Sequence, residues 1–153
     1  MKISIVEGNL LEQPVDCIVN AWNRNIIPWW MLIPHGVSGA IKKRGGVKPF
    51  QEIGSTGPLP LGHARKTGAG NLPFKAIIHV ASIDLLWKAS EDSISQSIVN
   101  AMKIAEESGF SSIAFPLLGT GSGRFNVEQA EAIMHKTFEK LDSKLAVTLV
   151  RFK

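Results

Sequence analysis

Two glycine-rich stretches carry the clearest chemical signal in this 153-residue sequence. The first reads His35-Gly36-Val37-Ser38-Gly39, and the second reads Gly119-Thr120-Gly121-Ser122-Gly123-Arg124-Phe125. Glycine at alternate positions lets backbone N–H groups converge on an anion. A helix that begins directly afterwards adds a partial positive charge at its N-terminus. Both stretches are therefore predicted to hold phosphate groups, although a glycine-rich turn can also be a plain connection.

The second stretch differs from the common nucleotide-binding loops. No Gly-Lys-Ser/Thr sequence follows Gly119, so the stretch is not a Walker loop. Gly119-x-Gly121 also lacks the third glycine of a dinucleotide-binding fingerprint, and the next predicted strand ends without an acidic residue for a ribose. The sequence therefore predicts a phosphate site of another kind.

Five short segments are predicted to be strands, because nearly every position in them is apolar, as in strands covered on both faces. They are Lys2–Val6, Cys17–Asn20, Ala76–Val80, Ser112–Leu118 and Leu145–Phe152. Helices must cover both faces of such a sheet. We expect a three-layer α/β/α sandwich on a mixed, mostly parallel sheet, formed by one domain over residues 1–153.

Three helices are predicted from capping residues and apolar spacing. The first spans Ser93–Ser108, with Ser93 and Gln96 as a capping box and four apolar residues on one face: Ile94, Ile98, Met102 and Ala105. The second opens at Asn126 and Gln129, with inward-facing Val127, Ala130, Ile133 or Met134, and Leu141. A shorter helix is expected from Val37 to Arg44. Because the two glycine stretches follow two of the predicted parallel strands, they should meet at one edge of the sheet, where ligands of such sheets bind.

Six segments in this order resemble the macrodomain family, whose members bind ADP-ribose and in some branches remove it from proteins or nucleic acids. They are Gly8-Asn9-Leu10, Val15 to Asn23, Gly36 to Ile41, Gly62 to Thr67 with Leu72-Pro73, Ile78-His79-Val80, and Ser112 to Gly121. The resemblance covers nearly the whole chain and implies a macrodomain-like fold.

The resemblance also implies the role of individual residues. Asn9, where the family usually has Asp, would meet the adenine amino group, unless it is only a turn residue. Asn23 would form hydrogen bonds with the hydroxyls of the distal ribose, whereas Asn20 would hold the backbone of the loop that follows its strand. Phe125 would cover a sugar or plug the core. The residues expected to form the ligand site are Asn9, Leu10, Asn20, Asn23, Gly36, Val37, Ser38, Gly119, Thr120, Gly121, Ser122, Gly123, Arg124 and Phe125.

The positions that catalyse hydrolysis in the family are altered. One branch has an Asp where this chain has Ser38, and another has an Asp in the second phosphate loop where this chain has Gly123. Neither replacement supplies a carboxylate base. His35 and Asp84 are the candidate substitutes. The alternative for His35 is a loop histidine hydrogen-bonded to the backbone, and the alternative for Asp84 is a helix-entry or turn residue.

Charge and cysteine content limit the partners. The net charge is +4, and nine basic residues but only two acidic ones lie between Arg24 and Lys88, a bias that attracts anions. A single cysteine, Cys17, fits a reduced, cytoplasmic protein, and we expect no metal and no cofactor. The apolar run Ile26–Ile33 is far shorter than the roughly 20 residues of a membrane span; it would act as a ligand lid, a subunit contact or core cover.

Three functions follow as hypotheses. The first is binding of ADP-ribose, or of a macromolecule that carries it. The second is an ADP-ribosyl hydrolase. The third is a single-stranded RNA-binding module that uses the basic half and its tryptophans, although a nucleic-acid partner is not expected because such a groove needs no glycine loops. The oligomeric state stays open.

Overall fold

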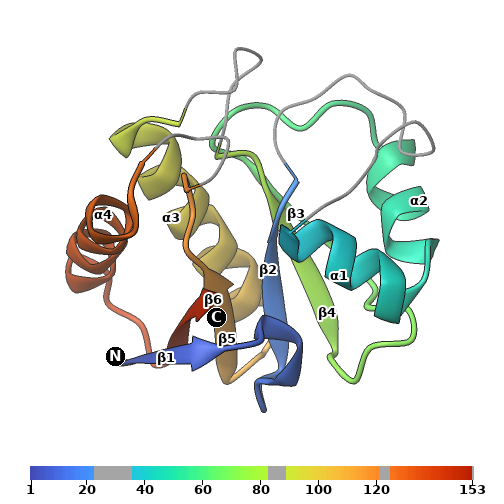
Figure 1. Cartoon of the computed structure of the whole chain (residues 1–153), viewed down its shortest axis with the longest axis horizontal. Helices are drawn as coiled ribbons and strands as arrows, with labels where there is room; N and C mark the ends of the chain where they lie inside the picture. The colour runs from blue at the N-terminus through green and yellow to red at the C-terminus, as the bar shows by residue number, and fades with distance from the viewer. Residues whose placement is uncertain (23–35, 83–88, 121–124, 153) are drawn as a thin grey trace.

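Six strands form a mixed sheet in the order β1-β6-β5-β2-β4-β3 (Figure 1). The computed structural model describes residues 1–22, 36–82, 89–120 and 125–152. The strands are β1 (Lys2–Gly8), β2 (Cys17–Ala21), β3 (Ala64–Thr67), β4 (Ala76–Val80), β5 (Ser112–Pro116) and β6 (Ala146–Phe152). The helices are α1 (Gly36–Gly45), α2 (Lys48–Ser55), α3 (Glu91–Glu107) and α4 (Val127–Glu139), with a 3-10 turn, η1 (Leu10–Glu12).

The first five strands of that order run parallel, and β3 is antiparallel to β4 at the edge. The predicted mixed, mostly parallel sheet is therefore confirmed. Because β2 pairs in parallel with both β4 and β5, the carboxyl ends of these three strands lie at one edge of the sheet. Sequence patterns do not predict β3, because Arg65 and Lys66 interrupt any apolar run. Charged residues are common on edge strands, which they protect from further pairing.

Two apolar layers lie on the two faces of the sheet. One contains residues of α3 and α4, and the other contains residues of η1, α1 and α2 (Figure 1). Alternation along β2 supplies both layers, since Cys17 and Val19 belong to the first and Ile18 to the second. This arrangement confirms the predicted three-layer α/β/α sandwich.

The structure corrects two predictions about the first residues of helices. α3 begins two residues earlier than expected, because Ser90 rather than Ser93 is its N-cap, and the capping box joins Ser90 to Ser93. In α4 the predicted capping box of Asn126 and Gln129 is confirmed, but Val127 is exposed rather than inward-facing. The first helical residue lies on the solvent side here, and burial begins one turn later at Ala130.

Asp16, which directly precedes β2, ties three neighbouring strands together at their amino ends. Its carboxylate oxygen Oδ2 accepts hydrogen bonds from the backbone N–H and the hydroxyl of Ser111, at 2.8 and 3.0 Å. Its backbone N–H donates to Ser112 Oγ, and its carbonyl accepts from the N–H of Lys75, both at 2.8 Å. The bond from the Ser111 backbone is the main reason that the pKa of Asp16 is lowered from 3.8. The ionised form is therefore stabilised by folding.

Asp16→Asn should lower the free energy of unfolding by about 1–2 kcal/mol at neutral pH, because the amide keeps one acceptor but loses the charge that strengthens these bonds. The wild-type advantage should be complete above pH 3.8, the ordinary pKa, and disappear as the pH falls through the lowered pKa of the folded state. Urea denaturation between pH 7 and pH 3 measures this difference. Asp142→Asn, which removes an exposed carboxylate, is the control. Equal effects of the two substitutions would contradict a structural role for Asp16.

Candidate ligand-binding site

The site predicted from the two glycine stretches lies after β2 and β5. β2 is followed along the chain by α1, whose first residue is Gly36, and β5 is followed by the turn at Gly119. Gly36, Val37 and Ser38 form the first turn of α1, where backbone N–H groups have no acceptor within the helix itself. At the other end of α1, the Gly45 carbonyl accepts a hydrogen bond from the N–H of Asn71 at 3.0 Å. Figure 1 shows α1 beginning beside the upper half of β2 and running away from that edge.

Gly119 adopts a conformation that suits glycine. Its φ is +85°, and a β-carbon at this position would lie 2.6 Å from Cδ1 of Ile94 and 3.1 Å from Cδ2 of Phe125. The carbonyl of Gly119 accepts from the N–H of Phe125 at 3.0 Å, so the two ends of the second stretch are joined. Thr120 adds a bond from its hydroxyl to the Leu117 carbonyl at 3.1 Å. The base of this loop is therefore held by specific contacts.

Phe125 packs on the apolar layer of α3 and α4, where it is partly buried. Its ring lies next to Gly119, close to Ile94 at the start of α3. Phe125 is expected either to cover a sugar of the ligand or to fill the core, and this packing favours the role in the core.

Asn9 caps η1. Its side-chain Oδ1 accepts from the N–H of Leu11 at 2.9 Å, and its backbone carbonyl accepts from the Gln13 side chain at 3.0 Å. The side chain of Leu10 is buried in the layer of α1 and α2. Since an amide oxygen has two lone pairs, Asn9 can cap the turn and still accept a hydrogen bond from a ligand.

Asn20 and His79 are fully buried on the α1 and α2 face of the sheet. Asn20 Nδ2 lies 3.1 Å from His79 Nδ1, and Thr67 Oγ1 lies 2.8 Å from His79 Nε2. Burial lowers the pKa of His79 from 6.5 to about 3, so the ring is neutral at physiological pH. His79 is therefore a core histidine whose two ring nitrogens both have hydrogen-bond partners. Sequence spacing gives no hint of its partner Asn20, which is 59 residues away.

Trp22 directly follows β2 and belongs to the apolar layer of α1 and α2. Its ring is almost completely buried against Phe50, with ring centroids 5.6 Å apart, and meets His79 edge-on at 6.0 Å. Trp22 therefore fills the core layer between β2 and α2.

Several predicted site residues lie outside the described part of the chain. They are Asn23, His35, Asp84, Gly121, Ser122, Gly123 and Arg124, together with the apolar run Ile26–Ile33. The structure therefore describes Gly36–Gly39 of the first stretch and Gly119, Thr120 and Phe125 of the second, and the other residues stay predictions.

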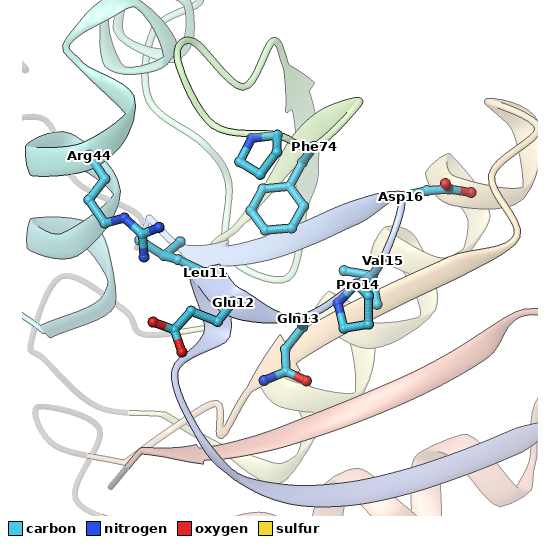
Figure 2. A pocket seen from close by; sticks show the side chains of 9 residues that line it. Leu11, Glu12, Gln13, Pro14, Val15, Asp16, Arg44 and Phe74 are labelled. Carbon is cyan, nitrogen blue, oxygen red and sulfur yellow. The ribbon is translucent and has the colours of Figure 1, made fainter.

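A hollow of about 570 Å³ lies at the opposite end of β2 (Figure 2). Figure 2 shows Phe74 and Arg44 on one side of it, with Glu12 and Pro14 on the other. This hollow is lined by residues at the amino end of β2, away from the α1 N-terminus and the Gly119 turn, so it is not the predicted phosphate site.

Other chemistry is limited among the described residues. They contain no group of three or more His, Cys, Asp or Glu side chains able to hold a metal ion. Cys17 is buried, and burial raises the pKa of its thiol to about 12, so it is an unreactive core residue. None of the helices within the described ranges has the length and apolar character needed to cross a bilayer.

Fold and loop positions thus define an α/β/α protein with a candidate anion site at the carboxyl edge of its sheet. The sequence model of the Macro domain matches residues 19–134. A macro domain-containing protein of Caldanaerobacter subterraneus subsp. tengcongensis is 36% identical, over 99% of this chain and 87% of that protein. The chain belongs to the macro domain family.

Two further relatives carry names that refer to ligands. The O-acetyl-ADP-ribose deacetylase of Escherichia fergusonii is 33% identical, over 89% of this chain and 77% of that enzyme. The structure of the Oceanobacillus iheyensis macrodomain with ADP superposes with a TM-score of 0.81 at 26% identity, over 95% of this chain and 80% of that one.

Gly119→Ala should destabilise the fold by roughly 1–3 kcal/mol, because a β-carbon there combines a left-handed backbone with a collision at Ile94. Gly57→Ala is the matched control, since Gly57 has a φ of +81° but no atom within 4 Å of the point that its β-carbon would occupy. Urea denaturation of both variants separates the backbone cost from the collision. A loss for Gly119→Ala no larger than that for Gly57→Ala would show that the contacts around Gly119 are loose.

Proposed function

We propose that this protein binds ADP-ribose, free or attached to a macromolecule, at the carboxyl edge of its sheet. The observation that carries the proposal is the placement of the α1 N-terminus and the Gly119 turn after β2 and β5, which are parallel neighbours. Two groups of backbone donors can then approach one diphosphate from two sides. The family membership and the ADP bound by the Oceanobacillus iheyensis macrodomain support this ligand class.

The ligand would extend from Asn9 at the adenine end to Asn23 at the distal ribose. Backbone donors at Gly36 and Val37, together with the stretch from Gly119 to Phe125, would hold the diphosphate between them. Side chains would thus bind the two ends of the ligand, and backbone N–H groups would bind its centre. Backbone donors suit a diphosphate because they carry no negative charge that would repel it.

ADP-ribose should bind at one site, and AMP should bind much more weakly, because AMP lacks the second phosphate and the distal ribose. Calorimetric titration with both ligands measures this difference. Gly121→Glu, which brings a carboxylate into the second glycine stretch, should abolish the heat of binding while the thermal unfolding midpoint stays nearly unchanged. Equal affinities for ADP-ribose and AMP, or no heat with either, would remove ADP-ribose binding as the function.

Hydrolysis is the second candidate, favoured by the names of several relatives such as the Escherichia fergusonii deacetylase. Ser38 lies in the first turn of α1, at the position where one hydrolytic branch of the family has an Asp. A serine hydroxyl does not replace a carboxylate base at neutral pH. His35 and Asp84 remain the candidate substitutes if the protein proves to be an enzyme.

Turnover of O-acetyl-ADP-ribose should be slow or absent, since the missing general base is worth about 10²–10⁴ in rate. Ser38→Asp should raise the rate, and Ser38→Asn, which has the same shape without a basic carboxylate, should not. Acetate release under single-turnover conditions measures both, with the Escherichia fergusonii enzyme as positive control. Rapid multiple turnover by the wild type would contradict this prediction, and His35→Ala and Asp84→Ala would then identify the substitute base.

A further inference from the structure

The two edges of the sheet differ in how well they are protected against further pairing. β3, at one edge, is four residues long and carries Arg65 and Lys66. β1, at the other edge, is seven residues long and has no charged residue at positions 3–6. β1 also lacks proline, and its pairing with β6 runs through the whole strand without a bulge. Because charges, proline and bulges keep edge strands from pairing again, the outer edge of β1 is open to another strand.

Ile5 makes this open edge apolar. It is 44% exposed although it lies in the middle of β1. Ile3 packs against the apolar layer of α3 and α4, and side chains two residues apart on a strand point to the same face. Ile5 therefore lies on that face, whereas Ser4 lies on the opposite face with Val6, which packs against the layer of α1 and α2. A strand added at this edge would cover Ile5.

A second copy of the chain fits this edge, because the sequence of β1 is able to pair with itself. Directly opposed residues of an antiparallel pair point to the same face, and a two-fold axis preserves this match. With Ser4 opposite Ser4 of the second copy, Ile5 of each copy lies opposite Ile3 of the other. Two apolar pairs then form on the face of α3 and α4, and the exposed Ile5 is covered in both copies.

Charge favours this register over its neighbours. With Ser4 on the two-fold axis, Lys2 lies opposite Val6, and the two Lys2 residues are roughly 13 Å apart along the strands. A shift of the second copy by two residues in one direction would make the two Lys2 side chains diagonal neighbours, which is unfavourable for like charges. The same shift in the other direction would place Glu7 opposite Ile3. Both alternatives are therefore poorer matches.

We propose that two copies of this protein pair through β1, antiparallel about a two-fold axis at Ser4, and join their sheets into one continuous sheet. The assembly closes at two copies, because the pairing uses the same edge of each copy and the other edge is protected. Antiparallel pairing points the carboxyl edges of the two sheets in opposite directions. If the proposed function holds, one dimer therefore presents two ADP-ribose sites on opposite sides; the pairing itself does not depend on that function.

Sedimentation equilibrium tests the dimer, over protein concentrations from about 5 to 500 µM because strand pairing alone is a small interface. Ile5→Lys places a charge opposite Ile3 in both copies and should raise the dimer Kd at least about tenfold. Val99→Lys is the matched control, since Val99 is 43% exposed on α3, and it should leave the Kd within about twofold. Circular dichroism verifies that both variants are folded.

A disulfide tests the register without altering Ile5. Directly opposed residues of an antiparallel pair have Cα atoms about 4.5–5.5 Å apart, which lies within the range that a disulfide spans. Ser4→Cys should therefore form a cross-linked dimer under mild oxidation, measured on a non-reducing gel. Lys2→Cys, on the same face of the same strand, should not, because its thiols lie too far apart. The native Cys17 is buried and does not take part.

A wild-type protein that stays monomeric over the whole concentration range would overturn the proposal. Equal dimerisation of Ile5→Lys and Val99→Lys would also overturn it, because the interface would then lie elsewhere. Cross-linking of Lys2→Cys as fast as that of Ser4→Cys would contradict the register, and assemblies larger than a dimer would contradict the two-fold closure. These measurements use no nucleotide, so failure of ADP-ribose binding would count against the proposed function alone.

Discussion

The parallel pairing of β2 with both β4 and β5 is the constraint on which the candidate site depends. It brings the carboxyl ends of three strands to one edge, so that segments far apart in the sequence leave the sheet together. Asp16 holds the same three strands at their amino ends through bonds to residues up to 96 positions away. A shift of β2 by one residue would move Asn20 from the α1 and α2 layer to the opposite face. Register therefore determines both the core and the chemistry at the edge.

Burial of polar groups next to that edge has a second consequence. His79 stays neutral because its burial in an apolar layer lowers the pKa of the ring, which disfavours the charged form. Trp22 and Phe50 enclose the ring and exclude water from it. Asn20 and Thr67 lie beside the two ring nitrogens, so the buried imidazole has a hydrogen-bond partner on each side.

Much of the fold can be predicted from the sequence because its strands are covered on both faces, and such strands are recognisable as apolar runs. The elements that the sequence does not reveal depend on contacts with distant residues. In β3, Arg65 and Lys66 interrupt the pattern, and pairing with β4 alone makes it a strand. In α2, Pro49 and Gly54 resemble a turn, but Phe50 and Ile53 are buried against the sheet.

The sequence predicts the parts of the candidate site that are formed by glycine residues and by the starts of helices. It predicts less well the parts that depend on which side chains form hydrogen bonds with one another. The glycine pattern predicts a tight turn at Gly119, and the positive φ of this residue agrees with that. Asn9 caps η1, which agrees with the turn role given as its alternative, and its amide oxygen keeps the acceptor expected at the adenine end. The bonds of Asn20 and Asp16 join residues that are distant in sequence, so no spacing rule can find them.

A crystal structure of the protein with ADP-ribose tests the central claim most directly. We predict the diphosphate between the N-terminus of α1 and the Gly119 turn, with the adenine beside Asn9. Nucleotide density in the hollow lined by Phe74 and Arg44, or at any other place away from the carboxyl ends of β2 and β5, would contradict this account.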